Sequence, residues 1–289
     1  MPTGHNYRMR VAVFGHRGWI GGQLIQHLQE AGLTVLRPDV RADDADAVRE
    51  YLAEARPDRV VSVLGRTHGP GCGTIDYLED AEGEHDKLRL NLRDNLFAPM
   101  TLALACVFQG VHFSYLGTGC IFEGDDGFTE DDDPNFFGSA YSVVKGYTDR
   151  LFRQPALPVL NARIRMPISS DDSPRNFIRK IASYERVVSV SNSVSVLPTL
   201  LPPFVQMIRD GYVGTVNLVN PGSISHAEVL DMYRQIVDPA FTYTLAASVP
   251  LKARRSNNRL DTSTLQMLFP SVPDVRAAAE RCLHDMKPL

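Results

Sequence analysis

Tyr141 and Lys145 have residue types and a spacing suited to proton donation. On a helix, a spacing of four puts both side chains on one face. A lysine ammonium beside a phenol is expected to lower the pKa of the phenol, so that Tyr141 can protonate a carbonyl oxygen during its reduction. Thr118 lies just beyond an apolar run, and its hydroxyl group is expected to bind the same carbonyl. These residues predict a carbonyl-reducing site.

A second set of residues has the spacing of a dinucleotide-binding turn. Gly15, Gly18 and Gly21 follow an apolar run and open a helical pattern. Glycines at these positions permit a tight turn, close approach of the backbone to a pyrophosphate, and close packing of helix on strand. The N-terminus of the helix then offers free N–H groups to the phosphates. The turn predicts a nicotinamide dinucleotide cofactor.

The residues after the second predicted strand bear on the choice between NADPH and NADH. Arg37 and Arg41 lie there, and Arg17 lies within the glycine turn. Guanidinium groups match the geometry of a 2′-phosphate, so we expect NADPH. Asp39 is the counter-evidence, because a carboxylate at this place can bind the ribose hydroxyls, and it leaves NADH possible.

A regular alternation of strand and helix patterns positions these residues. Apolar runs typical of buried parallel strands lie at residues 9–14, 34–36, 59–64, 111–116 and 158–164, with helical patterns at 19–31, 43–55, 86–108 and 141–152. This order predicts an α/β fold, a Rossmann-type doubly wound parallel sheet, in residues 1–165. Residues 166–289 are expected to form a smaller C-terminal substrate lobe, with strands near 187–190 and 215–218, and the chain there can re-enter the sheet.

The composition excludes several other classes of function. The formal net charge is −4, so no basic field is available to bind nucleic acid or an anionic membrane. No apolar run approaches the roughly 18–20 residues that span a bilayer, and the first residues lack the pattern of a secretion signal. The four cysteines have no metal-ligand spacing, which indicates reduced thiols. We expect a cytoplasmic protein that needs no metal ion.

Several longer runs resemble the extended short-chain dehydrogenase/reductases, in particular their nucleotide-sugar branch. Residues 15–21 are similar to the turn of GDP-fucose synthases. The bifunctional UDP-4-keto-6-deoxyglucose 3,5-epimerase/4-reductases are matched at residues 18–22, 118–123, 165–171, 174–178, 220–222, 225–226 and 255–258. The resemblance covers nearly the whole chain. It implies conversion of UDP-4-keto-6-deoxy-D-glucose to UDP-L-rhamnose with NADPH.

The resemblance also implies residue roles. Cys120 matches an acid/base for epimerisation at C3 and C5, and Lys180 matches its partner. If the chain stays extended, Cys120 points the same way as Thr118. The remaining implied residues are Trp19 and Ile20 for the cofactor, and Met166, Arg175, Asn176, Arg255 and Asn257 for the nucleotide sugar.

Alternatives remain open. The chain departs from the plant enzymes by a shorter loop at residues 124–134 and a longer segment at 72–85, which leaves the nucleotide less certain than the reaction. The other enzymatic interpretations are a dTDP-4-dehydrorhamnose reductase or a relative of GDP-fucose synthase. A non-catalytic regulatory module of the same fold is the rival from another class. Homodimers formed through a helix pair are usual among the relatives, so a homodimer is expected.

Overall fold

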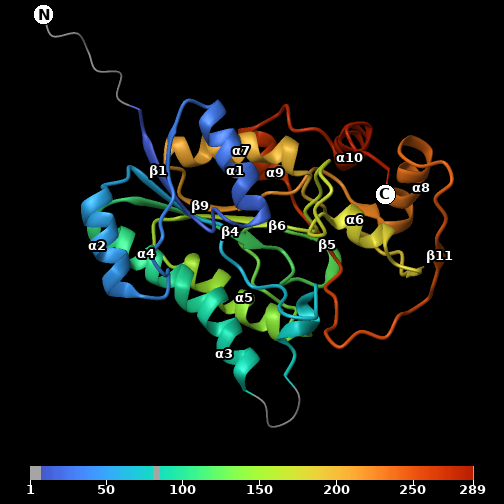
Figure 1. Cartoon of the computed structure of the whole chain (residues 1–289), viewed down its shortest axis with the longest axis horizontal. Coiled ribbons are helices and arrows are strands. Elements are labelled where there is room, and N and C mark those ends of the chain that lie inside the picture. The colour runs from blue at the N-terminus through green and yellow to red at the C-terminus, as the bar shows by residue number, and fades with distance from the viewer. Residues whose placement is uncertain (1–7, 81–84, 289) are drawn as a thin grey trace, which may run out of the picture.

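The computed structural model describes residues 8–80 and 85–288 (Figure 1). Residues 1–7, where we expect no secretion signal, and residues 81–84, in the predicted loop, lie outside the described residues. The central layer is a six-stranded sheet in the order β2-β1-β3-β4-β6-β9, with every neighbouring pair parallel. Its strands are β1 (Arg10–Phe14), β2 (Thr34–Leu36), β3 (Arg59–Ser62), β4 (His112–Thr118), β6 (Leu160–Ile164) and β9 (Gly214–Asn217). The predicted doubly wound α/β sheet is confirmed.

Alternation along the strands divides the interior between two apolar cores. Val11 and Val13 of β1 face one core, whereas Ala12 and Phe14 of the same strand face the other. The first core packs α1 (Trp19–Glu30), α7 (Leu197–Asp210) and α9 (Ser263–Leu268) on the sheet. The second packs α2 (Ala45–Ala55), α4 (Ala98–Gln109) and α5 (Ala140–Phe152) on its opposite face, as Figure 1 shows. A strand that is buried on both faces needs apolar residues throughout, which is why β1 is a nearly continuous run of apolar residues.

The single helix predicted at residues 86–108 is interrupted in the structure. It consists of α3 (Asp86–Leu92), the π-helical turn η2 (Arg93–Phe97) and α4. Pro99 in the first turn of α4 has no N–H to donate to the carbonyl oxygen of Asn95, four residues earlier. The hydroxyl of Thr148 on α5 donates to that carbonyl instead, at 2.8 Å. The interruption therefore follows from the proline, and it ties this helix to α5.

The chain beyond residue 165 divides between the sheet and a smaller lobe. Strand β9 and helix α7 belong to the central sheet and its covering layer. The lobe contains α6 (Phe177–Ala182), α8 (His226–Ile236) and α10 (Val275–His284) around a core of their own. Its strand pairs are β8 (Ser191–Asn192) with β10 (Ile224–Ser225), and β7 (Arg186–Val187) with β11 (Thr244–Leu245). The strand predicted at 187–190 is wrong, because residues 189 and 190 are exposed and pairing resumes only at Ser191.

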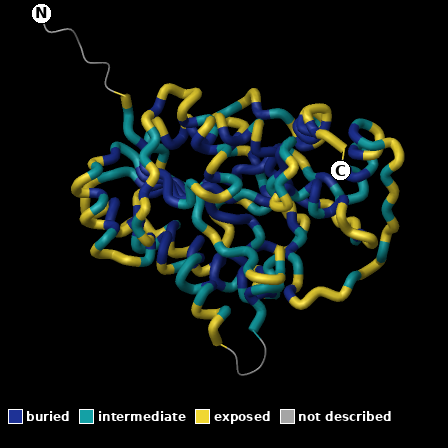
Figure 2. Tube along the Cα trace, viewed as in Figure 1, coloured by how far each residue is buried: buried dark blue, intermediate teal, exposed yellow. Residues whose placement is uncertain are grey.

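The remaining elements join the two parts of the molecule. They are η1 (Ile75–Leu78), and β5 (Gly124–Phe128), which pairs in parallel with β12 (Asn258–Leu260). Figure 2 shows buried residues gathered along the central sheet and on the inward sides of the helices. Among the described helices, none has the length and hydrophobicity to cross a membrane.

Candidate active site

The glycine turn has the backbone geometry that its sequence predicts. Gly15 has φ +91°, a conformation that side chains disfavour. A Cβ on Gly21 would lie 2.1 Å from the carbonyl oxygen of Gly15, so helix and strand approach too closely for any other residue. No side chain caps the N-terminus of α1, which leaves N–H groups of its first turn free for phosphate oxygens. The turn therefore fits a dinucleotide, with Trp19 and Ile20 half-buried at the start of the helix.

The arginines expected near the adenosine ribose lie on the surface beside β2. Arg17 forms an exposed ion pair with Asp39 at 2.7 Å, and Arg41 pairs with Asp43 at 2.7 Å. Arg37 is also exposed. Exposed ion pairs contribute little to stability, so these guanidinium groups can exchange a carboxylate for a phosphate at small cost.

Helix α5 carries Tyr141 and Lys145 on one buried face. Ser139 caps the helix, its Oγ accepting the N–H of Ser142 at 3.1 Å. The ammonium of Lys145 donates to the hydroxyl of Tyr115 on β4 and lies 4.5 Å from the centre of that ring. Burial lowers the pKa of Lys145 to about 7. The lysine is thus close to half-protonated near neutral pH.

The electrostatic expectation for Tyr141 is wrong. Burial raises the pKa of Tyr141 above its ordinary value, the charge of Cys120 raises it further, and a hydrogen bond with Thr118 lowers it. Lys145 does not lower it, because its ammonium points to Tyr115. In this structure Tyr141 is a neutral phenol that can donate its proton.

The turn after β4 places Cys120 beside these residues. Thr118 is the last residue of β4 rather than a residue beyond it, and the chain bends at Gly119. The expectation that the chain stays extended from Thr118 to Cys120 is therefore wrong. The N–H of Cys120 donates to the Thr118 hydroxyl at 3.1 Å, and the Ser142 hydroxyl donates to the Cys120 carbonyl at 2.7 Å. These two hydrogen bonds fix the turn against α5.

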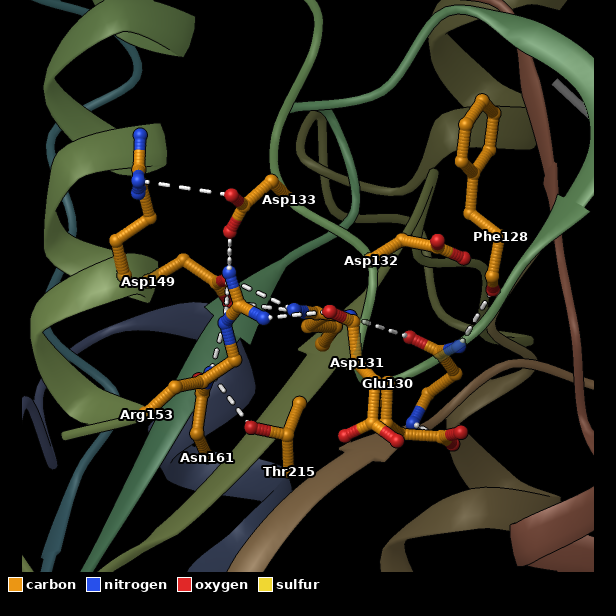
Figure 3. Close-up of polar contacts among 12 residues, drawn as sticks. Phe128, Glu130, Asp131, Asp132, Asp133, Asp149, Arg153, Asn161 and Thr215 are labelled. Atoms are coloured by element: carbon orange, nitrogen blue, oxygen red, sulfur yellow. Dashed lines mark hydrogen bonds and ion pairs between the residues drawn. The ribbon is translucent and has the colours of Figure 1, made fainter. Parts of the chain in front are cut away.

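A buried ion pair holds α5 against the sheet. Arg163 of β6 is fully buried and donates to both carboxylate oxygens of Asp149, at 2.8 and 2.7 Å. Asn161 donates to the same carboxylate at 2.8 Å, and Arg163 also donates to the carbonyl of Thr129 at 3.1 Å. Figure 3 shows Asp149 among these contacts, with the exposed run Asp131, Asp132 and Asp133 nearby. The network joins α5, β6 and the loop after β5.

The other predicted residues gather around the smaller lobe. Lys180 of α6 donates to the carbonyl of Gly73 at 3.1 Å, and both line a cavity of about 570 Å³. Burial lowers the pKa of Lys180, and Arg175 and Arg255 lower it further. Arg175 contacts the imidazole of His68, with 2.6 Å between Nη1 and Nδ1. Within the described ranges, no hydrogen bond or ion pair connects Lys180 with Cys120.

Three of the predicted substrate residues have roles within the chain. Asn176 is fully buried and caps α6, its Oδ1 accepting the N–H of Ile178 at 3.2 Å. Arg255 forms an ion pair with Asp76 at 2.6 Å. Asn257 accepts a hydrogen bond from Asn192 at 3.0 Å. Met166 adopts a left-handed backbone, with φ +39°, between β6 and the lobe.

Comparison with known proteins places the chain among nucleotide-sugar enzymes. The family described as the RmlD substrate binding domain matches residues 9–145. The L780 protein of Acanthamoeba polyphaga mimivirus is 46% identical over 96% of this chain and 99% of its own. The crystal structure of the L780 UDP-rhamnose synthase covers 97% of this chain and 100% of that chain, with a TM-score of 0.92 and 45% identity. This chain belongs to the RmlD family of extended short-chain dehydrogenase/reductases.

Two further similar proteins extend the comparison. An Arabidopsis thaliana bifunctional dTDP-4-dehydrorhamnose 3,5-epimerase/dTDP-4-dehydrorhamnose reductase is 37% identical over 91% of this chain and 89% of its own. A dTDP-4-dehydrorhamnose reductase from Bacillus anthracis, solved with NADP, has the same fold, with a TM-score of 0.81 at 18% identity over 96% of this chain and 99% of that one.

Some residues around the candidate site were not predicted from the sequence. Tyr115 and His68 contact Lys145 and Arg175, and Arg165 lies beneath the turn that carries Cys120. Tyr115 lies within a strand and was indistinguishable from a core residue. His68 lies in a loop without a motif. In the part of the chain that the structure describes, no three His, Cys, Asp or Glu side chains are grouped as metal ligands.

Proposed function

We propose that this chain is a bifunctional 3,5-epimerase/4-reductase that converts UDP-4-keto-6-deoxy-D-glucose to UDP-L-rhamnose. The observation that carries the proposal is a cysteine, Cys120, next to Thr118 and Tyr141: its backbone N–H donates to the Thr118 hydroxyl at 3.1 Å, and its charge raises the pKa of Tyr141. A reductase alone needs Tyr141 and Thr118 but no thiol. The L780 UDP-rhamnose synthase, at 45% identity, supports the UDP sugar, and the Arabidopsis relative, at 37% identity, supports the combination of epimerase and reductase activities.

Tyr141 is the proton donor in the reductive half of the reaction. It gives its phenolic proton to O4 while the hydroxyl of Thr118 holds the same oxygen. General acid catalysis of this kind is worth roughly 10²–10⁴ in rate. NADPH, when bound, supplies the hydride for C4. The glycine turn with Trp19 and Ile20 would hold its pyrophosphate, and Tyr141 and Lys145 would also contact the cofactor.

Cys120 and Lys180 are the acid/base pair of the epimerising half. The C–H bonds at C3 and C5 are acidic only because the neighbouring C4 carbonyl accepts their electrons. Inversion needs one group to remove a proton from one face and another to return a proton to the opposite face. Lys180 suits this exchange, since burial and Arg175 lower its pKa and favour release of a proton.

Surface charge and surface hydrophobicity support two further parts of the proposal. Arg17, Arg37 and Arg41 favour NADPH over NADH, because three guanidinium groups near the ribose suit a 2′-phosphate. The end of η2 and helices α4 and α5 expose a set of large apolar side chains, which we define as the apolar helix face: Phe97, Leu104, Phe108, Tyr147 and Leu151. We assign this face to contact between two copies of the chain.

Solvent deuterium tests the epimerase assignment. Wild-type protein incubated with UDP-4-keto-6-deoxyglucose and NADPH in D₂O should yield UDP-L-rhamnose carrying deuterium at C3 and C5, identified by NMR. Cys120→Ser should incorporate no deuterium, yet still reduce UDP-4-keto-L-rhamnose supplied separately. Cys106→Ala is the control, because Cys106 is buried in the core. A Cys120→Ser protein that epimerises at the wild-type rate would remove Cys120 from the mechanism.

A reductase without epimerase activity is the second candidate, since the fold is shared with dTDP-4-dehydrorhamnose reductases. The same experiment separates the two. A pure reductase would leave the unepimerised sugar free of deuterium and oxidise NADPH only with a 4-keto-L-rhamnose nucleotide. Comparing the rates of NADPH oxidation with the dTDP and UDP forms of that sugar identifies the nucleotide that the protein prefers.

A further inference from the structure

Arg165 is a fully buried arginine directly beneath the turn that carries Cys120. It follows β6, with 1% of its surface exposed. Its Nη1 donates to the Gly119 carbonyl at 3.3 Å and to Ser256 Oγ at 2.7 Å. Its Nη2 donates to Asn192 Oδ1 at 2.5 Å and to the Ser256 carbonyl at 3.0 Å. All of these acceptors are neutral.

Comparison with Arg163, two residues earlier, shows that the partners of Arg165 are unusual for a buried arginine. Arg163 is also fully buried, but Asp149 neutralises it through two hydrogen bonds. Among the described residues, no carboxylate forms an ion pair with Arg165, and its Nε has no hydrogen-bond partner. Burying an unpaired charge is costly unless another group compensates it. The neutral acceptors therefore leave the positive charge of Arg165 without an opposite charge, and a negative group that forms nearby would be stabilised by it.

The backbone is shaped to bring Arg165 against the turn. A Cβ on Gly119 would lie 3.0 Å from Cγ and 3.1 Å from Cδ of Arg165, and 2.6 Å from Leu260 Cδ1. Glycine between Thr118 and Cys120 thus makes room for the arginine stem. Burial lowers the pKa of Arg165, and the charge of Cys120 counteracts this. Cys120 is the group able to become an anion that acts on this guanidinium.

The other titratable groups around the turn are weaker sources of positive charge. Tyr141 and Lys145 face Cys120 from α5. Tyr141 is neutral, and Lys145, with a pKa of about 7, is close to half-protonated at neutral pH. His226 faces Arg165 from the start of α8. Burial lowers the pKa of His226, and the charge of Arg165 lowers it further, although a hydrogen bond with the Val190 backbone raises it in part. Arginine stays protonated throughout the physiological range.

We propose that Arg165 is a positioning residue that stabilises the thiolate of Cys120 and so prepares it to act as the base in epimerisation. The role of the thiolate as a base in epimerisation rests on the proposed function. The thiolate sulfur takes the proton from C3 or C5, the S–H bond forms as the C–H bond breaks, and the electron pair moves onto O4 as an enolate. The ammonium of Lys180 protonates the opposite face, and both groups then exchange protons with solvent.

Alkylation by iodoacetamide tests this without substrate, because only the thiolate reacts. The rate at Cys120, followed by mass spectrometry from pH 6 to 9, should fall about tenfold at pH 7 in Arg165→Met, the loss expected when an inflection moves by one pH unit. Arg165→Lys keeps the charge and should stay within about threefold of wild type. Circular dichroism and NADP⁺ binding establish that each variant is folded.

Two outcomes would overturn the proposal. An unchanged alkylation rate in folded Arg165→Met would show that the charge does not act on Cys120. Equal slowing in Arg165→Lys and Arg165→Met would indicate packing instead of charge. If Arg165→Met does not fold, the wild-type profile decides: an inflection displaced by one pH unit changes the rate about 30-fold between pH 6 and 9, against roughly 200-fold for an ordinary thiol, and an ordinary profile would overturn the proposal. Because no sugar is present, these results are independent of the reaction assignment.

Discussion

At the scale of single residues, Lys145 is deeply buried and is positively charged at acidic pH. Its exposed fraction is 3%, and burial lowers its pKa from 10.5 to about 7. Between these two values the unfolded chain binds more protons than the folded chain. The free energy of unfolding therefore rises with pH from about 7 to 10.5. Below pH 7 both states are protonated, and the full cost of burying the ammonium remains.

Lys145→Met should reveal this cost. Methionine fills similar space without a charge, so the variant should gain stability relative to wild type mostly at pH 6, and the gain should shrink by pH 9. Urea unfolding at pH 6, 7.5 and 9 measures the difference. The exposed Lys252→Met is the matched control. A difference that is constant across pH would contradict the lowered pKa.

The residues that the sequence could predict are those with a local signal. Tyr141 and Lys145 share a helix face, so their spacing was sufficient to group them, whereas the place of Cys120 depends on the bend at Gly119. Arg165 shows the limit, because an arginine after a strand reads as an exposed charge. Its burial results from Ser256 and Asn192, which are distant in the sequence. The direction of the Lys145 ammonium likewise depends on Tyr115, 30 residues away.

At the scale of elements, the position of α5 depends on the Asp149–Arg163 pair. This helix carries Tyr141 and Lys145, and Figure 3 shows the polar contacts that fix its C-terminal half. Periodicity predicted the helix but not this anchor, because each partner alone reads as an ordinary charge. Periodicity also did not predict the π turn before α4. Pro99 has no N–H for the Asn95 carbonyl, and the hydroxyl that replaces it comes from Thr148 on another helix.

Arg163→Met should strongly destabilise the fold, because Asp149 keeps a buried charge and loses its main partner. The expected loss in the free energy of unfolding is about 3–5 kcal/mol, measured by urea unfolding. Arg276→Met is the control, since Arg276 pairs with Glu228 at the surface and should cost less than about 1 kcal/mol. Equal losses in the two variants would show that the buried pair is not the anchor of α5.

At the scale of the whole molecule, hydrogen bonds connect helix α1 to the segment that leads into the smaller lobe. The indole of Trp19 donates to Asp171 at 2.8 Å, and Ser169 donates to Gln23 at 3.0 Å. Both halves of the proposed site therefore depend on one interface between sheet and lobe. No sequence pattern marks this interface, because its partners lie about 150 residues apart, whereas the sheet itself follows from a local alternation of strands and helices.

The opposite side of the molecule carries the apolar helix face, and its occupant can be tested through Phe108, which is 81% exposed. In a two-fold dimer every substitution occurs twice, so Phe108→Glu places two carboxylates in one contact. We expect a wild-type dimer of twice the 32.1 kDa chain mass, and a Phe108→Glu dimer weakened at least about 100-fold. Sedimentation velocity measures both. Met267→Glu, on α9 and 75% exposed, is the control and should leave the dimer intact. A wild-type monomer would contradict the assignment, and a Phe108→Glu protein that remains dimeric would place the contact elsewhere.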